Sequence, residues 1–339
     1  MEKLIIKGSQ SDSQLLIGES FKEFKSYLPN KQVIVLMDDK VKKLYGTYFN
    51  NYHIIEIGQT EKVKNLTTVD YILGQLLKLG ADRNVFLLAV GGGIVCDILG
   101  FVASIYLRGV DFGFISSTLL SQVDASVGGK NGVNYSGFKN MVGVFNQPKF
   151  VICDSSMLKT LDTDDLYSGF AEIVKHTLIA DAQMFSQLEQ NYNKALNLDE
   201  NFINKLVLNS VNIKSQIVNK DEKEKGERRK LNLGHTYGHA VEKVLGISHG
   251  KAVSIGIVMA AKLSLSKKTI TEQDYNRVIN LLKSLNLPVS ISEKHTEILD
   301  ALIMDKKREG DNIHFVLMNG IGDVSIELIS IEELRKIKL

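Results

Sequence analysis

The sequence predicts an α/β domain over residues 1–155, followed by a mainly α-helical domain over residues 156–339. The first region alternates short β-branched or aromatic runs with helical stretches, which is typical of a parallel α/β sheet. The second region carries the 3.6-residue apolar period of helices almost throughout. A chain of 339 residues also exceeds the length of one ordinary core, so two domains are expected.

Six strands are expected in the first region, each ending in Gly, Asp or Ser or close to one: residues 4–7, 33–39, 53–58, 85–93, 112–116 and 150–154. A helix is expected over 62–80, where apolar residues recur at helical spacing until Gly80. This alternation favours parallel strands covered by helices on both faces.

In the second region the helical period covers 165–190, 199–220, 235–246, 251–267, 272–285 and 296–304. Only 314–318 and 324–328 look extended. A ligand of a parallel sheet binds beyond the carboxyl ends of its strands. If the helical domain caps that edge, the cleft between the domains is the expected active site.

Composition excludes several classes of function. Apolar residues make up 44% of the chain and its formal charge is +2, so we expect neither disorder nor a field that gathers nucleic acid or membrane. No run reaches the ~18–20 apolar residues of a membrane span, and the first residues do not resemble a signal peptide. Cys96 and Cys153 lie in apolar contexts and are expected to be reduced core residues. We therefore expect a cytoplasmic protein.

The run GGGIVCD (91–97) follows the strongest predicted strand and opens an apolar helix that runs to about residue 106. Glycines there allow backbone N–H groups to approach a phosphate, although a tight strand-to-helix turn explains the motif equally well. Asp38 ends another strand, where a carboxylate could bind ribose hydroxyls. A helix N-cap is the simpler role for Asp38.

Residues 117–143 are rich in glycine and small polar residues, and they contain Asp124, Lys130, Lys139 and Asn140. Lysines among backbone donors suit phosphate or carboxylate groups. The segment is therefore expected to line a site, with a solvated surface loop as the alternative.

His235, His239 and His249 fall within fifteen positions, and the first two share a helix face. Imidazoles grouped in this way favour a site for Zn²⁺ or a similar cation, and a carboxylate could complete it. Glu172 is the best candidate, with a helical ion pair to Lys175 or His176 as the alternative.

The interleaved charges of residues 220–230 indicate a solvated turn. Because the turn leads into the histidine helix, Glu224 and Arg228 could point into the same cleft.

Seven motifs carry a resemblance that spans residues 38–322: GGGIVCDILGFVAS, STLLSQVDASVGGK, GFKNMVG, SGFAEIVKH, DEKEKGERRKLNLGHTYGHAVE, HGKAV and DKK. In order and spacing they resemble the 3-dehydroquinate synthase family. The resemblance implies a Rossmann-like NAD-binding domain, a helical metal- and substrate-binding domain, and a homodimer. It implies conversion of 3-deoxy-D-arabino-heptulosonate 7-phosphate to 3-dehydroquinate and phosphate, by transient oxidation with NAD, elimination, reduction, ring opening and aldol closure. Zn²⁺ or Co²⁺ is the implied metal.

The resemblance also implies site residues, position by position. NAD would be bound by Asp38, Glu61, Lys64, Gly92, Gly93, Ile94, Val95, Asp97, Ser117, Thr118, Asp124, Lys130, Lys139 and Thr160. The implied metal ligands are Glu172, His235 and His249, so His239 would face the substrate. Reaction and substrate binding would involve Arg108, Asp124, Lys130, Asn140, Lys175, Lys214, Glu224, Arg228, Asn232, His239 and Lys306. His239 is a candidate proton shuttle on the substrate hydroxyls.

The chain departs from the family pattern at Thr60, Cys96, Ser117 and Lys251, where the family commonly has Gly, Gly, Thr and Glu. Three alternatives stay open: a cyclase of sedoheptulose 7-phosphate or an amino analogue, a metal-dependent polyol dehydrogenase, and a binding module without turnover. The lysine and arginine pattern around the expected cleft favours the dehydroquinate reaction.

Overall fold

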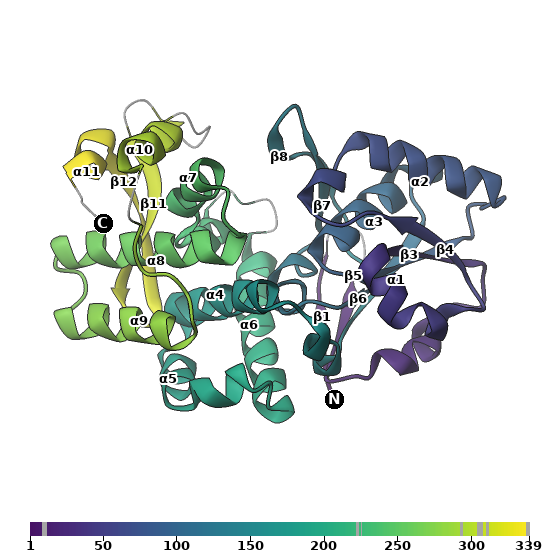
Figure 1. Ribbon diagram of the computed structural model, residues 1–339, viewed down its shortest axis with the longest axis horizontal. Coiled ribbons are helices and arrows are strands. Elements are labelled where there is room, and N and C mark those ends of the chain that lie inside the picture. Colours follow the sequence, from purple (N-terminus) through teal and green to yellow (C-terminus); the bar gives the residue numbers. More distant parts are fainter. Residues whose placement is uncertain are drawn as a thin grey trace. The chain divides into compact units, whose positions relative to one another are not determined.

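The computed structural model describes residues 1–8, 12–221, 224, 226–291, 294–303, 308–309 and 312–336. The chain divides into two compact units, Met1–Leu161 and Asp162–Leu339, and Figure 1 labels most of their helices and strands.

The first unit is built on a seven-stranded sheet in the order β1-β2-β9-β6-β5-β3-β4. Its strands are β1 (Glu2–Ile6), β2 (Ser13–Ile17), β3 (Val33–Asp38), β4 (His53–Ile57), β5 (Phe86–Gly91), β6 (Asp111–Ser116) and β9 (Phe150–Cys153). All pairs are parallel except β1 with β2. The six predicted strands are confirmed, whereas β2 was not predicted, because its SQLLI sequence is short and has no clear alternation.

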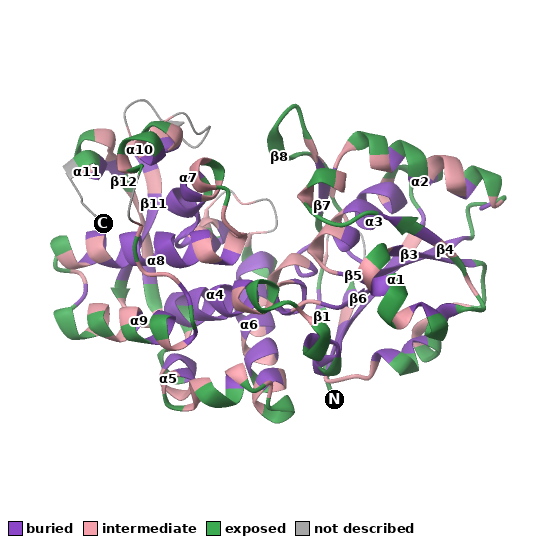
Figure 2. Ribbon diagram, in the orientation of Figure 1, coloured by how far each residue is buried: buried purple, intermediate pink, exposed green. Residues whose placement is uncertain are grey.

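The central strands are buried because helices pack around them. Every residue of β5 is buried, as its continuous apolar sequence FLLAVG predicts (Figure 2). The helices of this unit are α1 (Asp39–Tyr45), α2 (Leu66–Lys78) and α3 (Gly93–Ile105). Helix α2 begins four residues later than predicted because the side chain of Asn65 accepts a hydrogen bond from the backbone N–H of Thr68 at 3.0 Å. Residues Glu61–Val63 form the separate 3-10 turn η3.

Residues 117–143 contain a hairpin that the sequence analysis missed. After a π-helical turn, η5 (Ser121–Ala125), strand β7 (Lys130–Tyr135) pairs with β8 (Phe138–Phe145) in an antiparallel hairpin apart from the main sheet. Its two-residue loop, Ser136–Gly137, has positive φ at both positions, as a primed hairpin turn requires. A Ser-Gly dipeptide between aromatic residues was the available signal.

The second unit is mainly helical, as predicted. Its helices are α4 (Thr163–Ala180), α5 (Ala182–Leu196), α6 (Glu200–Lys220), α7 (His235–Leu245), α8 (His249–Ser266), α9 (Glu272–Ser284), α10 (His295–Ile303) and α11 (Ile331–Lys336). Strands β10 (Arg308–Glu309), β11 (Asn312–Gly320) and β12 (Asp323–Ser330) form an antiparallel sheet. The predicted helix 165–190 is two helices, because Asp181 ends α4 and its side chain caps Met184 of α5 at 2.8 Å.

Helices α4 and α8 are largely buried, and they carry Glu172 and His249 respectively (Figure 2). They approach closely at Gly250, where a Cβ would lie 2.1 Å from the Cα of Ser168. Only glycine permits this contact, which lies one residue from His249. Among the described residues, no helix combines the length and apolar character that crossing a membrane requires.

Candidate active site

The carboxyl ends of three adjacent strands bring together residues that are distant in sequence. Met37 of β3 pairs with Val90 of β5, and Gly91 of β5 pairs with Ser116 of β6. Asp38, the glycine turn and Ser117 therefore lie side by side at one edge of the sheet. The strand order reverses between β3 and β5, because β4 extends the sheet beyond β3 while β6 extends it on the other side. Such a switch point is where open α/β sheets bind nucleotides.

The glycine turn opens α3 without a side-chain cap. Gly92 is the N-cap residue, and Gly93, Ile94 and Val95 form the first turn of the helix. A Cβ on Gly92 would lie 2.9 Å from the Cγ2 of Thr118. Glycine therefore allows close packing against Thr118 and also leaves room for a phosphate to approach the backbone N–H groups. The strand-to-helix turn proposed as the alternative is therefore real. Its uncapped N–H groups and the helix dipole also suit an anion.

Asp38 performs the simpler role that the sequence suggested for it. Its side chain accepts a hydrogen bond from the backbone N–H of Val41 at 2.8 Å and caps α1. Burial raises the pKa of this carboxyl group above its usual value.

Cys96 points into the core of the first unit. Its Sγ lies 3.9 Å from the hydroxyl of Ser121 and 3.9 Å from the carbonyl oxygen of Gly91. Burial raises the pKa of this thiol to about 12, so it stays protonated. Cys96 and Cys153 are both free and buried, as predicted. The side chain of Cys96 therefore lies in the buried core and does not face solvent.

A buried lysine joins three segments of the first unit. The Nζ of Lys64 lies 2.5 Å from a carboxylate oxygen of Asp97 on α3 and donates to the Oδ1 of Asn140 on β8 at 2.6 Å. Nearby, Asn134 of β7 donates to Glu61 at 2.7 Å. Five positions from separate segments thus form one polar cluster, four of which the resemblance had implied.

The other implied residues of this unit have varied positions. Asp124 lies in η5, Lys130 begins β7, Lys139 is exposed on β8, and Thr160 shares a 2.8 Å hydrogen bond with Tyr45. Arg108 is exposed and lies in the 3-10 turn η4 (Tyr106–Arg108), three residues after α3 ends. Because α3 has 13 residues, Arg108 lies about 20 Å along the helix from the glycine turn.

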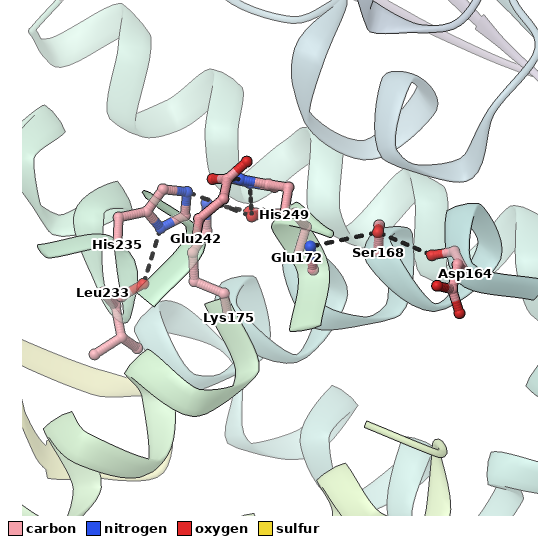
Figure 3. A network of polar contacts seen from close by, with 9 residues as sticks. Asp164, Ser168, Glu172, Lys175, Leu233, His235, Glu242 and His249 are labelled. Atoms are coloured by element: carbon pink, nitrogen blue, oxygen red, sulfur yellow. Dashed lines mark hydrogen bonds and ion pairs between the residues drawn. The ribbon is translucent and has the colours of Figure 1, made fainter. Parts of the chain in front are cut away.

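In the second unit, Glu172, His235 and His249 converge. One ligand atom of each lies within 4.8 Å of the other two. The Oε1 of Glu172 is 3.4 Å from the Nε2 of His235 and 3.3 Å from the Nε2 of His249 (Figure 3). A carboxylate and two imidazoles form a ligand set that Zn²⁺ prefers, with room for a further ligand. The three residues therefore fit a divalent cation.

Three helices supply these side chains. Glu172 lies in the middle of α4, His235 is the first residue of α7, and His249 is the first residue of α8. His239, one turn after His235, is exposed and does not belong to the group of three. Its ring centroid lies 5.3 Å from that of His235.

The two imidazoles of the group differ in their electrostatics. Burial, together with the positive charge of Lys175, lowers the pKa of His235 well below its usual value. Its Nδ1 lies 3.1 Å from the carbonyl oxygen of Leu233, which leaves Nε2 as the ligand atom of a neutral ring. For His249, burial opposes the charged form, but the carboxylates of Glu172 and Glu242 outweigh it and raise the pKa to about 9.

Glu242 is a residue that the sequence analysis missed. Its Oε2 lies 3.4 Å from the Nδ1 of His249, on the opposite side of the ring from Glu172. The available signal was its position on α7, seven residues after His235, which places both on one helix face.

Among the described residues of the second unit, three cationic side chains are buried: Lys175 is 1% exposed, Lys214 7% and Arg228 2%. The solvated turn predicted for residues 220–230 is therefore wrong at Arg228. Asp221, which the sequence analysis did not select, holds this turn by accepting hydrogen bonds from the backbone N–H groups of Gly226 (2.7 Å) and Arg228 (3.1 Å).

Close to the same turn, Asn232 donates to the carboxylate of Glu224 at 2.8 Å. Lys306 lies outside the described residues. The unusual Lys251 forms an ion pair with Asp164 at 2.7 Å, so its charge is directed toward α4.

Comparison with solved structures identifies the class of protein to which this fold belongs. The chain resembles the solved structure of 2-deoxy-scyllo-inosose synthase complexed with carbaglucose-6-phosphate, NAD⁺ and Co²⁺ (26% identity, TM-score 0.86, 99% of this chain and 100% of that one). It also resembles 2-epi-5-epi-valiolone synthase from Streptomyces hygroscopicus with NAD⁺ and Zn²⁺ (26% identity, TM-score 0.88, 98% and 96%). The fold is that of the sugar phosphate cyclases.

Within that class, the chain belongs to the 3-dehydroquinate synthase family. The family's N-terminal model matches residues 54–168, and its C-terminal model matches residues 169–308. The 3-dehydroquinate synthase of Thermoanaerobacter pseudethanolicus is 38% identical over 327 residues, which cover 92% of this chain and 91% of that protein.

Proposed function

We propose that this chain is an NAD- and divalent-metal-dependent lyase that converts 3-deoxy-D-arabino-heptulosonate 7-phosphate to 3-dehydroquinate and phosphate. The observation that carries the proposal is the carboxylate–imidazole group of Glu172, His235 and His249 in a chain of this family. The solved relatives that contain NAD⁺ with Co²⁺ or Zn²⁺ support the same two cofactors.

The second unit supplies the metal ligands and the groups for an anionic substrate. A divalent cation held by Glu172, His235 and His249 would polarise a substrate hydroxyl and stabilise negative charge beside it. Lys175, on the same helix as Glu172, is a cation close to that position. The exposed imidazole of His239 lies beside the metal group and is suited to move a proton on a substrate hydroxyl near neutral pH.

Further binding groups come from the loop before α7 and from α6. Arg228 offers a planar fork of donors for a carboxylate or phosphate, and Lys214 offers a point charge. Glu224 and Asn232, which are hydrogen-bonded to each other, present acceptors and donors for hydroxyl groups. Lys306 remains part of this proposed set on the strength of the resemblance.

The first unit would bind NAD⁺, which supplies an oxidant that is regenerated within each turnover. Gly92, Gly93, Ile94, Val95 and Asp97 would surround the pyrophosphate. Asp38 would contact the adenine ribose, and Glu61 and Lys64 belong to the same NAD-binding set. The remaining residues of the proposed NAD site are Ser117, Thr118, Asp124, Lys130, Lys139 and Thr160. Arg108 and Asn140 would contact the substrate.

We further propose a cytoplasmic homodimer. The two buried free cysteines support a reducing compartment. The dimer rests on the family resemblance, and light scattering of the purified protein would test it.

The deciding experiment follows phosphate release from 3-deoxy-D-arabino-heptulosonate 7-phosphate by EDTA-treated protein. NAD⁺ and Zn²⁺ or Co²⁺ are added singly and together, while NADH absorbance is recorded. Release that needs both additions, without steady accumulation of NADH, is the expected result. Accumulating NADH would instead identify a dehydrogenase, and turnover confined to sedoheptulose 7-phosphate would identify a different cyclase.

A further inference from the structure

The contact between Glu242 and His249 has a chemical consequence for the proposed metal site. An imidazole that coordinates a cation through one ring nitrogen usually donates a proton from the other. The Nε2 of His249 lies 3.3 Å from the Oε1 of Glu172, so this nitrogen belongs to the group of ligand atoms. Its Nδ1 lies 3.4 Å from the Oε2 of Glu242, whose side chain is 14% exposed.

The orientation of the His249 ring depends on side-chain contacts more than the orientation of the His235 ring does. His235 is fixed by the backbone, since the carbonyl oxygen of Leu233 lies 3.1 Å from its Nδ1. His249 is the first residue of α8 and is more exposed, with 28% of its side chain accessible against 11% for His235. Its ring is therefore oriented by side chains, one on each side.

Glu242 is also held in place by the fold. It lies on α7, two helical turns beyond His235, so the same helix face carries one ligand and the partner of the other ligand. Its carboxylate oxygen contacts Nδ1 and does not belong to the group of mutually close ligand atoms formed by Glu172, His235 and His249. Glu242 is therefore placed to act on a cation through the imidazole of His249 and not as one of the three grouped ligands.

We propose that Glu242 is a positioning residue that holds His249 with its proton on Nδ1 and its lone pair on Nε2, directed at the cation. This inference rests on the proposed metal site and deepens it. A carboxylate in this role also makes the imidazole a better electron donor, and loss of such a partner costs about 10- to 100-fold in metal affinity.

The test measures Zn²⁺ binding to metal-free protein by competition with a chromogenic chelator, without substrate or turnover. E242A should weaken Zn²⁺ binding about 10- to 100-fold. E242Q, whose amide oxygen still accepts a hydrogen bond from Nδ1, should lose distinctly less affinity. The absorption spectrum of the Co²⁺-loaded variants reports ligand geometry independently, and we expect E242A to change its ligand-field bands.

D164N is the matched control. Asp164 contacts Lys251 in the same first turn of α8, but it does not touch an imidazole. D164N should therefore bind Zn²⁺ within about threefold of the unmodified protein. An equal loss of Zn²⁺ affinity in D164N and E242A would overturn the inference, because both contacts would then act only by stabilising the start of α8.

Unchanged Zn²⁺ affinity and Co²⁺ spectrum in E242A would overturn it as well. If E242A does not fold, E242Q decides the question: a loss larger than that of D164N but smaller than that of H249Q supports the inference, and a loss no larger than that of D164N or equal to that of H249Q contradicts it. Failure of the unmodified protein to bind either metal would instead refute the proposed site itself, which keeps the two failures distinct.

Discussion

Lys175 forms an ion pair with Glu172 one turn earlier on α4, and both side chains are buried, at 1% and 0% exposure. The carboxylate makes two sets of contacts at once, because Oε2 faces the ammonium while Oε1 faces His235 and His249. The helical ion pair that the sequence offered for Glu172 is therefore present, and the same carboxylate also lies close to both imidazoles, as a shared cation would require.

Replacing Glu172 with Gln should weaken both sets of contacts, and two measurements report them separately. The variant keeps the shape of the side chain but loses a ligand charge, so we expect Zn²⁺ affinity to fall by more than about 100-fold. Stability without metal should fall by about 3 kcal/mol, because breaking a buried ion pair leaves the other charge without that partner. Urea unfolding and chelator competition measure the two effects.

The double variant E172Q/K175M is the control for that prediction. Methionine removes the buried charge at similar volume, so stability should return toward the starting value while metal affinity stays low. If stability does not recover, the loss in E172Q comes from a source other than the ion pair.

Gly250→Ala should disturb the three candidate metal ligands, although Gly250 is not one of them. The new Cβ would lie 2.1 Å from the Cα of Ser168, so α4 and α8 must move apart. Since these helices carry Glu172 and His249, we expect a stability loss of about 2–3 kcal/mol and weaker Zn²⁺ binding. Gly74→Ala on α2 is the matched control, because a Cβ there meets nothing within 4 Å. It should raise stability by about 0.5–1 kcal/mol. Equal stability of the two variants would contradict the helix-packing argument.

Sequence reasoning predicted the fold well where one physical signal dominated. The apolar runs of β3 and β5 and the period of α8 depend on burial alone, and each lies within a few residues of its prediction. Boundaries moved where a single cap decided them, as at Asn65 and Asp181.

The candidate site was harder to predict, because the residues that support its side chains do so through contacts that form only in the folded protein. Glu242 and Asp221 read as ordinary charged residues in sequence, and only the fold shows that they contact His249 and the backbone around Arg228. The polar cluster around Lys64 likewise depends on the β7–β8 hairpin, and no local sequence pattern predicts the register of its two strands.

Replacing Lys64 with Met should loosen that cluster. Its side chain is 6% exposed and its partner Asp97 is 18% exposed, so the ion pair is largely shielded from water. We expect a loss of about 2–3 kcal/mol in unfolding free energy and weaker NAD⁺ binding by calorimetry. Lys42→Met removes an ion pair with Glu56 in which both side chains are more than 40% exposed. That control should change stability by less than about 0.5 kcal/mol. Similar losses in both variants would show that burial is not what makes the Lys64 pair important.

The metal-free protein should lose stability as pH rises from about 6.5 to 9. Glu172 and Glu242 raise the pKa of folded His249 to about 9, above the value of about 6.5 for an unfolded histidine. The folded state therefore binds this proton more tightly, and the resulting stabilisation is complete below pH 6.5 and lost as pH approaches 9. The lowered pKa of His235 acts in the opposite direction, but only below pH 6.5.

Urea unfolding in EDTA at several pH values, compared with H249Q, measures this contribution. H249Q should show a flatter profile between pH 6.5 and 9. With saturating Zn²⁺ the slope should reverse for the unmodified protein, because metal binding displaces the imidazole proton and so becomes stronger as pH rises. Identical slopes for the unmodified protein and H249Q in EDTA would mean that Glu172 and Glu242 do not hold a proton on His249.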